Sequence, residues 1–156
     1  MLLVSEWASR TTMGQPTLFE SIAAGDIPSH KVAEGELWYA FLDIFPRTPG
    51  HTLVVPRIGK QHLSDLMKEE RDALFEGVSI VQHQLSSFFQ TDDFTVCVHD
   101  GPLAGQEVPH VHVHVLPRIE YDGGKTLQAM WPQAPPMGGD SDHVALGLLA
   151  TSLRGA

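Results

Sequence analysis

The chain of 156 residues has little cysteine, few basic residues and no long apolar run, and each deficit excludes a class of protein. A single cysteine, Cys97, permits neither an intramolecular disulfide framework nor a zinc site built from several thiolates. Ten basic against nineteen acidic residues give a net charge of −9, which argues against a broad surface for a nucleic-acid polymer. One small anionic ligand in a local site is compatible with that charge.

The apolar runs of the chain are all short. None approaches the roughly 20 residues that span a bilayer. The opening Met1–Val4 is interrupted at Glu6, which does not match a secretory signal. We therefore expect a cytoplasmic protein with no membrane association. Apolar residues at 42% and charged residues at 19% are typical of a globular protein, and the length is that of one domain.

The order of helix and strand patterns predicts an α+β fold with an antiparallel sheet. Residues 1–16 lack periodicity and are expected to form a flexible extension. Thr17 and Glu20 fit a helix capping box, and Gly25 is expected to end that helix. Ser141 is a candidate cap for a short helix near the end of the chain. The predicted strands are 31–34, 37–45, 51–56, 94–99 and 110–116, and the predicted helices are 17–25, 68–90 and 141–153.

The most informative segment is the predicted strand His110–Leu116, in which histidine alternates with valine. Successive side chains of a strand point to opposite faces, so His110, His112 and His114 share one face. A strand whose polar face is histidine by chance would look the same. A metal site is a sharper alternative, because imidazole is a common ligand. The third interpretation is catalysis at phosphorus, in which a neutral imidazole attacks and a neighbouring imidazole stabilises or protonates.

Two segments resemble a known family, the histidine-triad (HIT) nucleotide hydrolases and transferases. The alternation His-φ-His-φ-His-φ-φ is the family signature. The run DGPLAGQEVPHVHVHVLPR at 100–118 is similar to the Fhit branch, and AFLDIFPRTPGHTLVVP at 40–56 matches the family's other hallmark. The segment 17–28 resembles the Hint branch. The resemblance covers about 100 residues, 17–118, and implies a HIT domain at 17–120 followed by a segment 121–156 that packs on the domain or on a dimer.

The resemblance implies catalytic roles for four histidines. His112 matches the nucleophile that forms a covalent nucleotidyl-histidine at the α-phosphorus. His114 matches the residue that contacts the α-phosphate and assists the leaving group, and His110 matches the residue that orients the nucleophile. His51 matches a supporting histidine beside the triad.

Further positions match the nucleotide-binding residues of the family. Asp43 matches the acceptor of the ribose hydroxyls, and a carboxylate is able to accept from both. Asp43 could instead start a local turn before Pro46, and the apolar candidates could simply be core residues. His99 is as suited to the surface as to a site. The remaining matches are an apolar pocket for the base (Phe19, Ile22, Phe41, Ile44) and polar groups near the phosphates (His99, Gln106, Glu107).

Four positions depart from the family pattern. Many bacterial relatives carry a zinc-binding C-x-x-C motif where this chain has Thr17 and Glu20, so we expect no structural zinc. Glu107 stands where the family commonly has a small hydroxyl residue, and its charge would repel phosphate or favour a cationic leaving group. His99 replaces a glutamine of the Fhit branch.

The resemblance implies a five-stranded antiparallel sheet with two main helices, and a homodimer with a continuous sheet. The expected reaction is hydrolysis of the α-phosphate linkage of an adenosine nucleotide derivative. A dinucleoside polyphosphate is the first substrate class, and an adenosine phosphoramidate is the alternative. A nucleotide-binding regulator with little turnover and a metal-dependent protein stay open as other classes. We expect no metal and no cofactor in the protein, although a polyphosphate substrate is able to carry magnesium.

Overall fold

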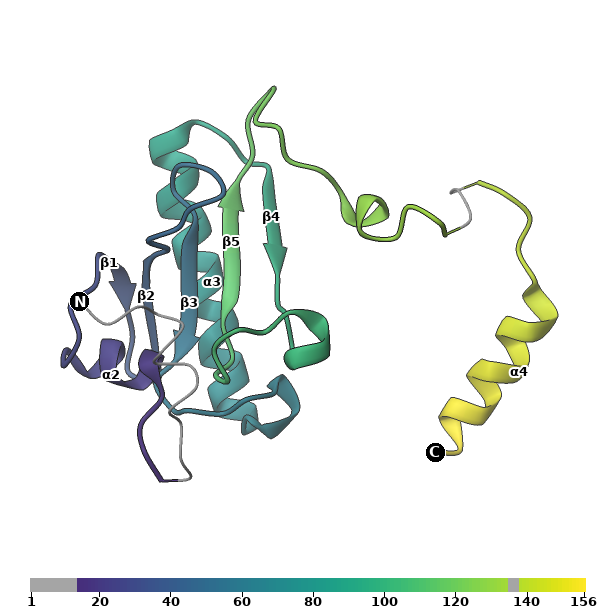
Figure 1. Cartoon of the computed structure of the whole chain (residues 1–156), viewed down its shortest axis with the longest axis horizontal. Helices are drawn as coiled ribbons and strands as arrows, with labels where there is room; N and C mark the ends of the chain where they lie inside the picture. Colours follow the sequence, from purple (N-terminus) through teal and green to yellow (C-terminus); the bar gives the residue numbers. More distant parts are fainter. Residues whose placement is uncertain (1–13, 135–137) are drawn as a thin grey trace. The chain divides into compact units, whose positions relative to one another are not determined.

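The computed structural model describes residues 14–134 and 138–156 and divides into two units after Asp122. Residues 1–13, most of the expected extension, lie outside the described residues. Among the described residues, the first unit contains a sheet, two α-helices and the 3-10 helices Leu63–Asp65 and Pro102–Ala104. The second, 123–156, contains the short 3-10 helix Leu127–Met130 and helix α4, His143–Arg154 (Figure 1). The second unit is described by itself, and its expected packing on the domain stays a prediction.

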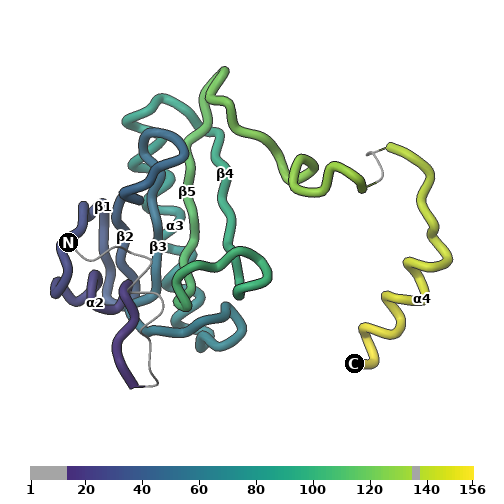
Figure 2. Tube along the Cα trace, in the orientation of Figure 1, coloured from purple at the N-terminus to yellow at the C-terminus, as the bar shows by residue number. Residues whose placement is uncertain are grey.

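Five strands form a single antiparallel sheet, which confirms the predicted architecture. Their order is β1-β2-β3-β5-β4, and the path of the chain from strand to strand can be followed in Figure 2. The crossing from β3 to β4 is made by helix α3, which returns the chain to the far edge of the sheet. The strands are β1 (Lys31–Glu34), β2 (Trp38–Leu42), β3 (Thr52–Pro56), β4 (Phe94–Cys97) and β5 (Val113–Pro117).

The two faces of the sheet bury different sets of side chains. Helix α3, Lys68–Phe89, packs on one face through four of the five apolar positions that its periodicity predicts, whereas the fifth, Phe88, is 80% exposed. Helix α2, Leu18–Ala24, packs on the other face through Phe19 and Ile22. The α3 face buries Trp38, Ala40, Val54, Leu74, Val78, Val81, Leu85, Val111, Val113 and Val115, and the α2 face buries Tyr39, Phe41, Leu53, Val55 and Val108.

The helix ends follow from local hydrogen bonds. The capping box of α2 is confirmed, because the Thr17 side chain accepts from the Glu20 amide and the Glu20 side chain accepts from the Thr17 amide. Gly25 ends α2 in the left-handed conformation, as predicted. For α4 the predicted cap Ser141 is wrong. The cap is Asp142, whose carboxylate accepts from the Ala145 amide at 2.9 Å. No helix of the described residues is long and apolar enough to cross a membrane.

Several predicted strands are longer than the observed ones, and the histidine segment is the important case. The segment His110–His112 precedes β5, although it was predicted to lie within the strand. The amide of Val111 donates to the carbonyl of Lys60, a loop residue, at 2.7 Å. The paired residues of β3 and β5 end at Val54 and Val113, and the Val111 amide bonds the loop instead of β3, so β5 begins only at Val113. The alternation of faces nevertheless continues through His110–His112.

The observed packing predicts that Gly77 is required by the contact between α3 and the sheet. A Cβ atom at Gly77 would lie 2.5 Å from Cδ2 of Trp38, whose indole is 5% exposed. In a helix, Ala is favoured over Gly by about 1 kcal/mol. Overpacking a core costs about 1–3 kcal/mol, so we expect Gly77→Ala to lower the free energy of unfolding.

Urea denaturation measures this effect. The control is Ser87→Ala at an exposed position of the same helix, which should change stability by less than about 0.5 kcal/mol. If Gly77→Ala stabilised the protein, the tight contact with Trp38 would be disproved.

Candidate active site

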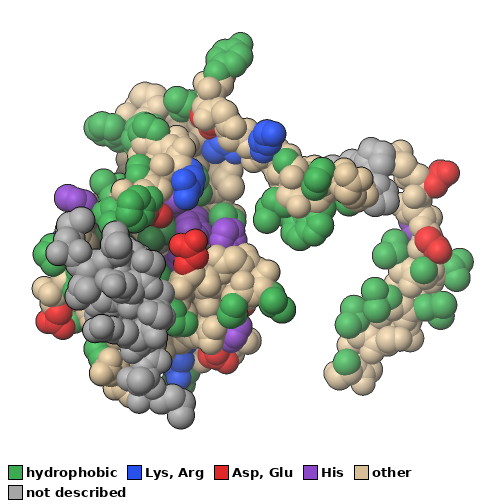
Figure 3. Space-filling view, viewed as in Figure 1, with side chains coloured by type: hydrophobic (Ala, Val, Ile, Leu, Met, Phe, Trp, Pro, Cys, Tyr) green, Lys and Arg blue, Asp and Glu red, His purple; other side chains and the backbone are tan. Residues whose placement is uncertain are grey.

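The three histidines of the segment lie on the α2 side of the sheet, and the alternating valines lie on the α3 side. His110 is fully buried, and His112 is 7% exposed. Phe19 of α2 contacts both rings, with ring centroids 5.6 Å from His110 and 5.1 Å from His112. Figure 3 shows histidine side chains on the visible face of the molecule beside an acidic side chain. The predicted shared face of the histidines is therefore confirmed.

His110 is held at both ring nitrogens. Its Nε2 lies 2.8 Å from the carbonyl oxygen of Pro56, at the end of β3. A carbonyl only accepts, so Nε2 carries the proton. Nδ1 lies 2.6 Å from the hydroxyl oxygen of Thr17. Burial lowers the pKa of His110 to about 4, so the ring is neutral at neutral pH.

His112 is oriented by a backbone carbonyl of its own segment. Its Nδ1 lies 2.8 Å from the carbonyl oxygen of His110 and must donate to it. In the neutral ring Nε2 therefore carries the lone pair. Burial lowers the pKa of His112, against the opposing effect of that hydrogen bond. The arrangement gives His112 an unprotonated nitrogen at neutral pH.

His114 of β5 is paired with His51, the residue directly before the neighbouring strand β3. The amide of Arg47 donates to Nδ1 of His51 at 3.2 Å. With its Nδ1 occupied as an acceptor, a neutral His51 carries its proton on Nε2 and donates to Nδ1 of His114 at 2.9 Å. The remaining nitrogen of His114, Nε2, then carries a proton. This atom is buried and has no hydrogen-bond partner among the described residues.

Two neighbouring rings thus present opposite chemistry. His112 offers a lone pair on Nε2, and His114 offers an N–H, with ring centroids 4.9 Å apart. Burial and the neighbouring histidines lower the pKa of His114 to about 4, which keeps this pair uncharged. A nucleophile beside a hydrogen-bond donor is the combination that displacement at a phosphoryl group requires.

Asp43 makes the local turn that its position before Pro46 allows, and it also approaches the histidines. Its Oδ1 accepts from the Phe45 amide at 2.8 Å, and its Oδ2 lies 3.7 Å from Nε2 of His51. Ligand atoms of Asp43, His51 and His114 lie within 4.8 Å of one another. A metal ion there would have to replace the proton between the two imidazoles, so this cluster is the place where a metal alternative would apply.

The apolar candidates fall into two groups. Phe19, Ile22 and Phe41 are buried in one cluster on the α2 face, and the rings of Phe19 and Phe41 lie 5.6 Å apart. Ile44 is 63% exposed and belongs to the loop after β2. The buried residues belong to the core cluster of the α2 face, and the Phe19 ring also lies beside the His112 ring.

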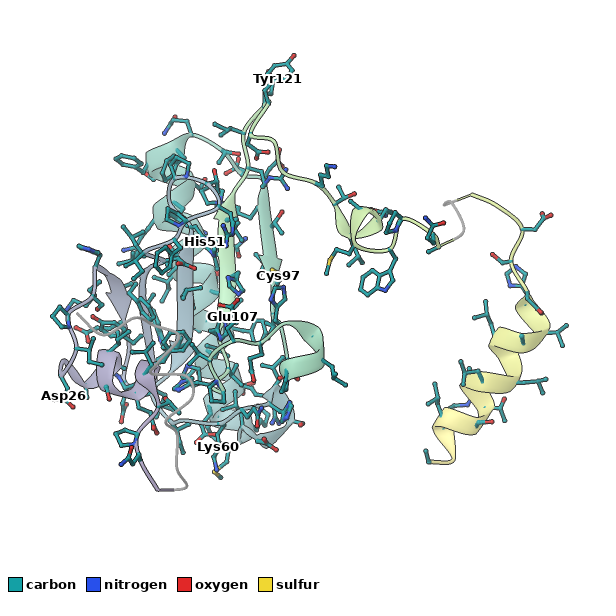
Figure 4. All side chains as sticks on the ribbon, viewed as in Figure 1. Asp26, His51, Lys60, Cys97, Glu107 and Tyr121 are labelled. Carbon is teal, nitrogen blue, oxygen red and sulfur yellow. The ribbon has the colours of Figure 1, made fainter. Side chains whose placement is uncertain are left out.

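The loop before the histidines carries the polar candidates. His99 lies beside His114, with ring centroids 5.3 Å apart. Gln106 is buried, and its amide donates to the carbonyl of Gln61 at 2.7 Å, which anchors the loop. Glu107 is exposed, and it is one of the charges that oppose the effect of burial on the pKa of His112. Figure 4 shows Glu107 near the start of β5, where the loop ends, and His51 beside a point farther along β5.

Sequence reasoning missed three groups that hold the site. The carbonyl of Pro56 and the amide of Arg47 are backbone atoms, which leave no sequence signal. Thr17 was recognised as a helix cap, but its contact with His110 spans 93 positions.

The geometry agrees with the comparison to known families, in which the model of the HIT domain matches residues 24–121. The chain belongs to the HIT family.

Relatives come from both branches of the HIT family. A HIT-like protein of Methanocaldococcus jannaschii is 40% identical over 106 residues, covering 68% of this chain and 81% of the relative. The adenosine 5'-monophosphoramidase of Saccharomyces cerevisiae is 32% identical over 131 residues, covering 84% and 79%. The asymmetrical bis(5'-nucleosyl)-tetraphosphatase of Schizosaccharomyces pombe is 41% identical over 83 residues, covering 53% of this chain and 46% of the enzyme. These names agree with the mixed Hint and Fhit features of the sequence.

Solved structures show the same fold. The crystal structure of a HIT family member from Bacillus subtilis has a TM-score of 0.78 and 30% identity, covering 90% of this chain and 96% of that one. The five-stranded sheet and its two helices are therefore the HIT fold.

The buried His110 predicts a fall in stability in mild acid. The unfolded ring gains a proton near pH 6.5, whereas the folded ring stays neutral down to about pH 4. The unfolded state therefore binds more protons in this window, and stability falls as the pH drops through it. One such histidine contributes a slope of about 1.4 kcal/mol per pH unit.

Urea unfolding at several pH values between 7 and 4.5 measures that slope. In His110→Gln the amide is still able to donate to the Pro56 carbonyl, but the side chain does not titrate. We expect stability to depend less steeply on pH in this variant, by the slope that corresponds to about one bound proton. Equal slopes in the two proteins would show that His110 is not neutral in the folded state.

Proposed function

We propose that this protein hydrolyses the α-phosphate linkage of adenosine nucleotide derivatives through a covalent nucleotidyl-histidine at His112. The observation that carries the proposal is the adjacent pair of His112 and His114, one with a lone pair and one with an N–H. Both states are set by hydrogen bonds to the rest of the fold. Two hydrolase names among the relatives support the same class of reaction.

The reaction has two displacements. In the first, Nε2 of His112 forms a bond to the α-phosphorus, and the bond from phosphorus to the leaving group breaks. The ring then carries the positive charge of an imidazolium, which the hydrogen bond from Nδ1 to the His110 carbonyl stabilises. The N–H of His114 donates to a phosphoryl oxygen or to the leaving atom. In the second, water attacks phosphorus and the P–N bond breaks. The proton lost by the water returns to His114 where that residue protonated the leaving atom, and otherwise passes to solvent, and the nucleoside monophosphate leaves with His112 neutral again.

Binding of the nucleoside is assigned to residues that flank the histidines, with Phe19 beside His112 and Asp43 beside His51. We propose that the base packs against Phe19 and Ile22 with Ile44 closing over it, and that Asp43 accepts the ribose hydroxyls. The exposed Ile44 would lose its contact with water on binding. His99, Gln106 and Glu107 would then flank the phosphates and the leaving group. We assign no resident metal, and magnesium would enter only with a polyphosphate.

Glu107 favours the second candidate, an adenosine 5'-phosphoramidase. Its carboxylate is close enough to raise the pKa of His112. The same negative charge would repel the several negative charges of a polyphosphate leaving group. An amine leaving group brings no such charge. The DGPLAGQ run at 100–106 resembles the Fhit branch and favours the dinucleoside polyphosphate instead.

A substrate panel separates the candidates. Diadenosine tri- and tetraphosphate are compared with an amine conjugate of AMP, with mass analysis of an acid-quenched reaction for an adenylylated histidine. Absence of turnover on all of them would favour a nucleotide-binding regulator. Activity on the amine conjugate that EDTA abolishes and zinc restores would favour the metal-dependent alternative.

The nucleophile is tested by His112→Asn, whose amide is able to keep the hydrogen bond to the His110 carbonyl. We expect turnover to vanish while AMP still binds. The control is His83→Asn on the exposed side of α3, which should keep the wild-type rate. Retention of more than about a tenth of the rate by His112→Asn would mean a loss of under about 1.4 kcal/mol, and the assignment would be wrong.

The ribose contact is tested by Asp43→Asn, which keeps an acceptor for the Phe45 amide and removes the charge. Wild type should bind 2'-deoxy substrates more weakly, because losing a hydrogen bond to a charged group costs about 1.5–3 kcal/mol. The variant should lose most of this discrimination, and Asp26→Asn, at an exposed position after α2, should retain it. Equal affinities of wild type for the two sugars would contradict the role of Asp43.

We also propose a homodimer that uses α3, as the family resemblance implies. The residues Phe75, Ile80 and Phe88 of α3 are exposed in the single chain. Sedimentation equilibrium should give twice the mass of the chain, and a monomer at all concentrations would remove this proposal.

A further inference from the structure

The start of helix α2 touches the histidine triad through Thr17. This residue is 8% exposed, and its hydroxyl oxygen lies 2.6 Å from Nδ1 of His110. The same oxygen accepts from the amide of Glu20 at 3.0 Å as the helix cap. One hydroxyl therefore serves both the end of a helix and a ring of the site, and the mechanism above makes no use of it.

The hydrogen atoms of this contact can be assigned. The Pro56 carbonyl takes the N–H of His110 Nε2, so a neutral ring carries its lone pair on Nδ1. The amide of Glu20 donates to Thr17, which leaves the O–H of Thr17 free to donate. It therefore donates to Nδ1 of His110. Both polar atoms of this fully buried ring are then paired.

We propose that Thr17 is a positioning residue for the nucleophile, acting through His110. The two bonds to its ring hold the side chain of His110, and the backbone carbonyl of the same residue accepts the N–H of His112. Displacement of His110 would therefore misdirect the His112 ring. This proposal rests on the proposed function, in which His112 attacks the α-phosphorus.

The position of Thr17 also ties the nucleophile to the wall of the base pocket. Phe19, the second residue of α2, makes T-shaped ring contacts with both His110 and His112. The first turn of α2 therefore contacts both His110 and His112, through Thr17 and Phe19. Because the interaction aligns reacting groups and does not itself touch the nucleotide, its removal should lower kcat and leave KM little changed.

Three variants separate this role from simple helix capping. Thr17→Val removes the hydroxyl at constant shape and should lower kcat by about tenfold to a hundredfold. Thr17→Ser restores the hydroxyl and should recover most of the rate. Thr17→Asp keeps a preferred helix cap, but an ionised carboxylate has no hydrogen to donate to Nδ1 of His110. This nitrogen must then carry a proton itself to form the hydrogen bond. We expect Thr17→Asp to lose kcat although its urea midpoint shows that the fold is retained.

A spectroscopic measurement completes the test without activity. Nitrogen-15 chemical shifts of the His110 ring, assigned with the His110→Gln variant, should show an unprotonated Nδ1 in wild type and a protonated one in Thr17→Asp. The wild-type rate in Thr17→Val or in Thr17→Asp, or a protonated Nδ1 in wild type, would overturn the proposal. A wild type that turns over none of the substrates would instead count against the proposed function, and the nitrogen shifts would still test the hydrogen bond.

Discussion

Main-chain partners fix the protonation of His110, His112 and His51, and His51 in turn fixes that of His114. The carbonyls of Pro56 and His110 require an N–H from His110 and His112, and the amide of Arg47 requires a lone pair on His51. Main-chain atoms keep their donor or acceptor character at every pH, and the fold sets their positions. The fold of the protein therefore fixes which ring nitrogen carries a lone pair and which carries a proton before a substrate binds. Burial adds to this by disfavouring the charged rings.

The features that sequence reasoning predicted well are those that neighbouring residues determine together. Alternation at His110–Leu116 assigned the histidines and valines to opposite faces, and it holds even where the segment leaves the sheet. The spacing of Thr17 and Glu20 predicted a cap that both side chains form. The α3 face was readable because its apolar positions recur with the helical period.

The features that were missed depend on partners far apart in the chain. Strand ends were overestimated because a residue's own β propensity does not say which carbonyl its amide will bond, and the Val111 amide bonds the loop carbonyl of Lys60. The contact of His51 with His114 spans 63 positions, and only the family resemblance, not a local pattern, placed His51 beside the triad. The cap of α4 moved by one residue because Ser141 and Asp142 are both good caps and only the backbone conformation selects between them.

Val111, Val113 and Val115 are all fully buried, so the face on which a side chain of this run lies depends on whether its position is odd or even. Inserting or deleting one residue between Pro109 and His110 would leave the pattern intact and shift only its position. A single-residue change inside the alternating run would exchange the faces of every side chain beyond it, placing imidazoles against α3 and valines in the site. A change of two residues would not. Within this run, length variation in divergent descendants should therefore occur in even steps, whatever happens to the amino-acid identities around it.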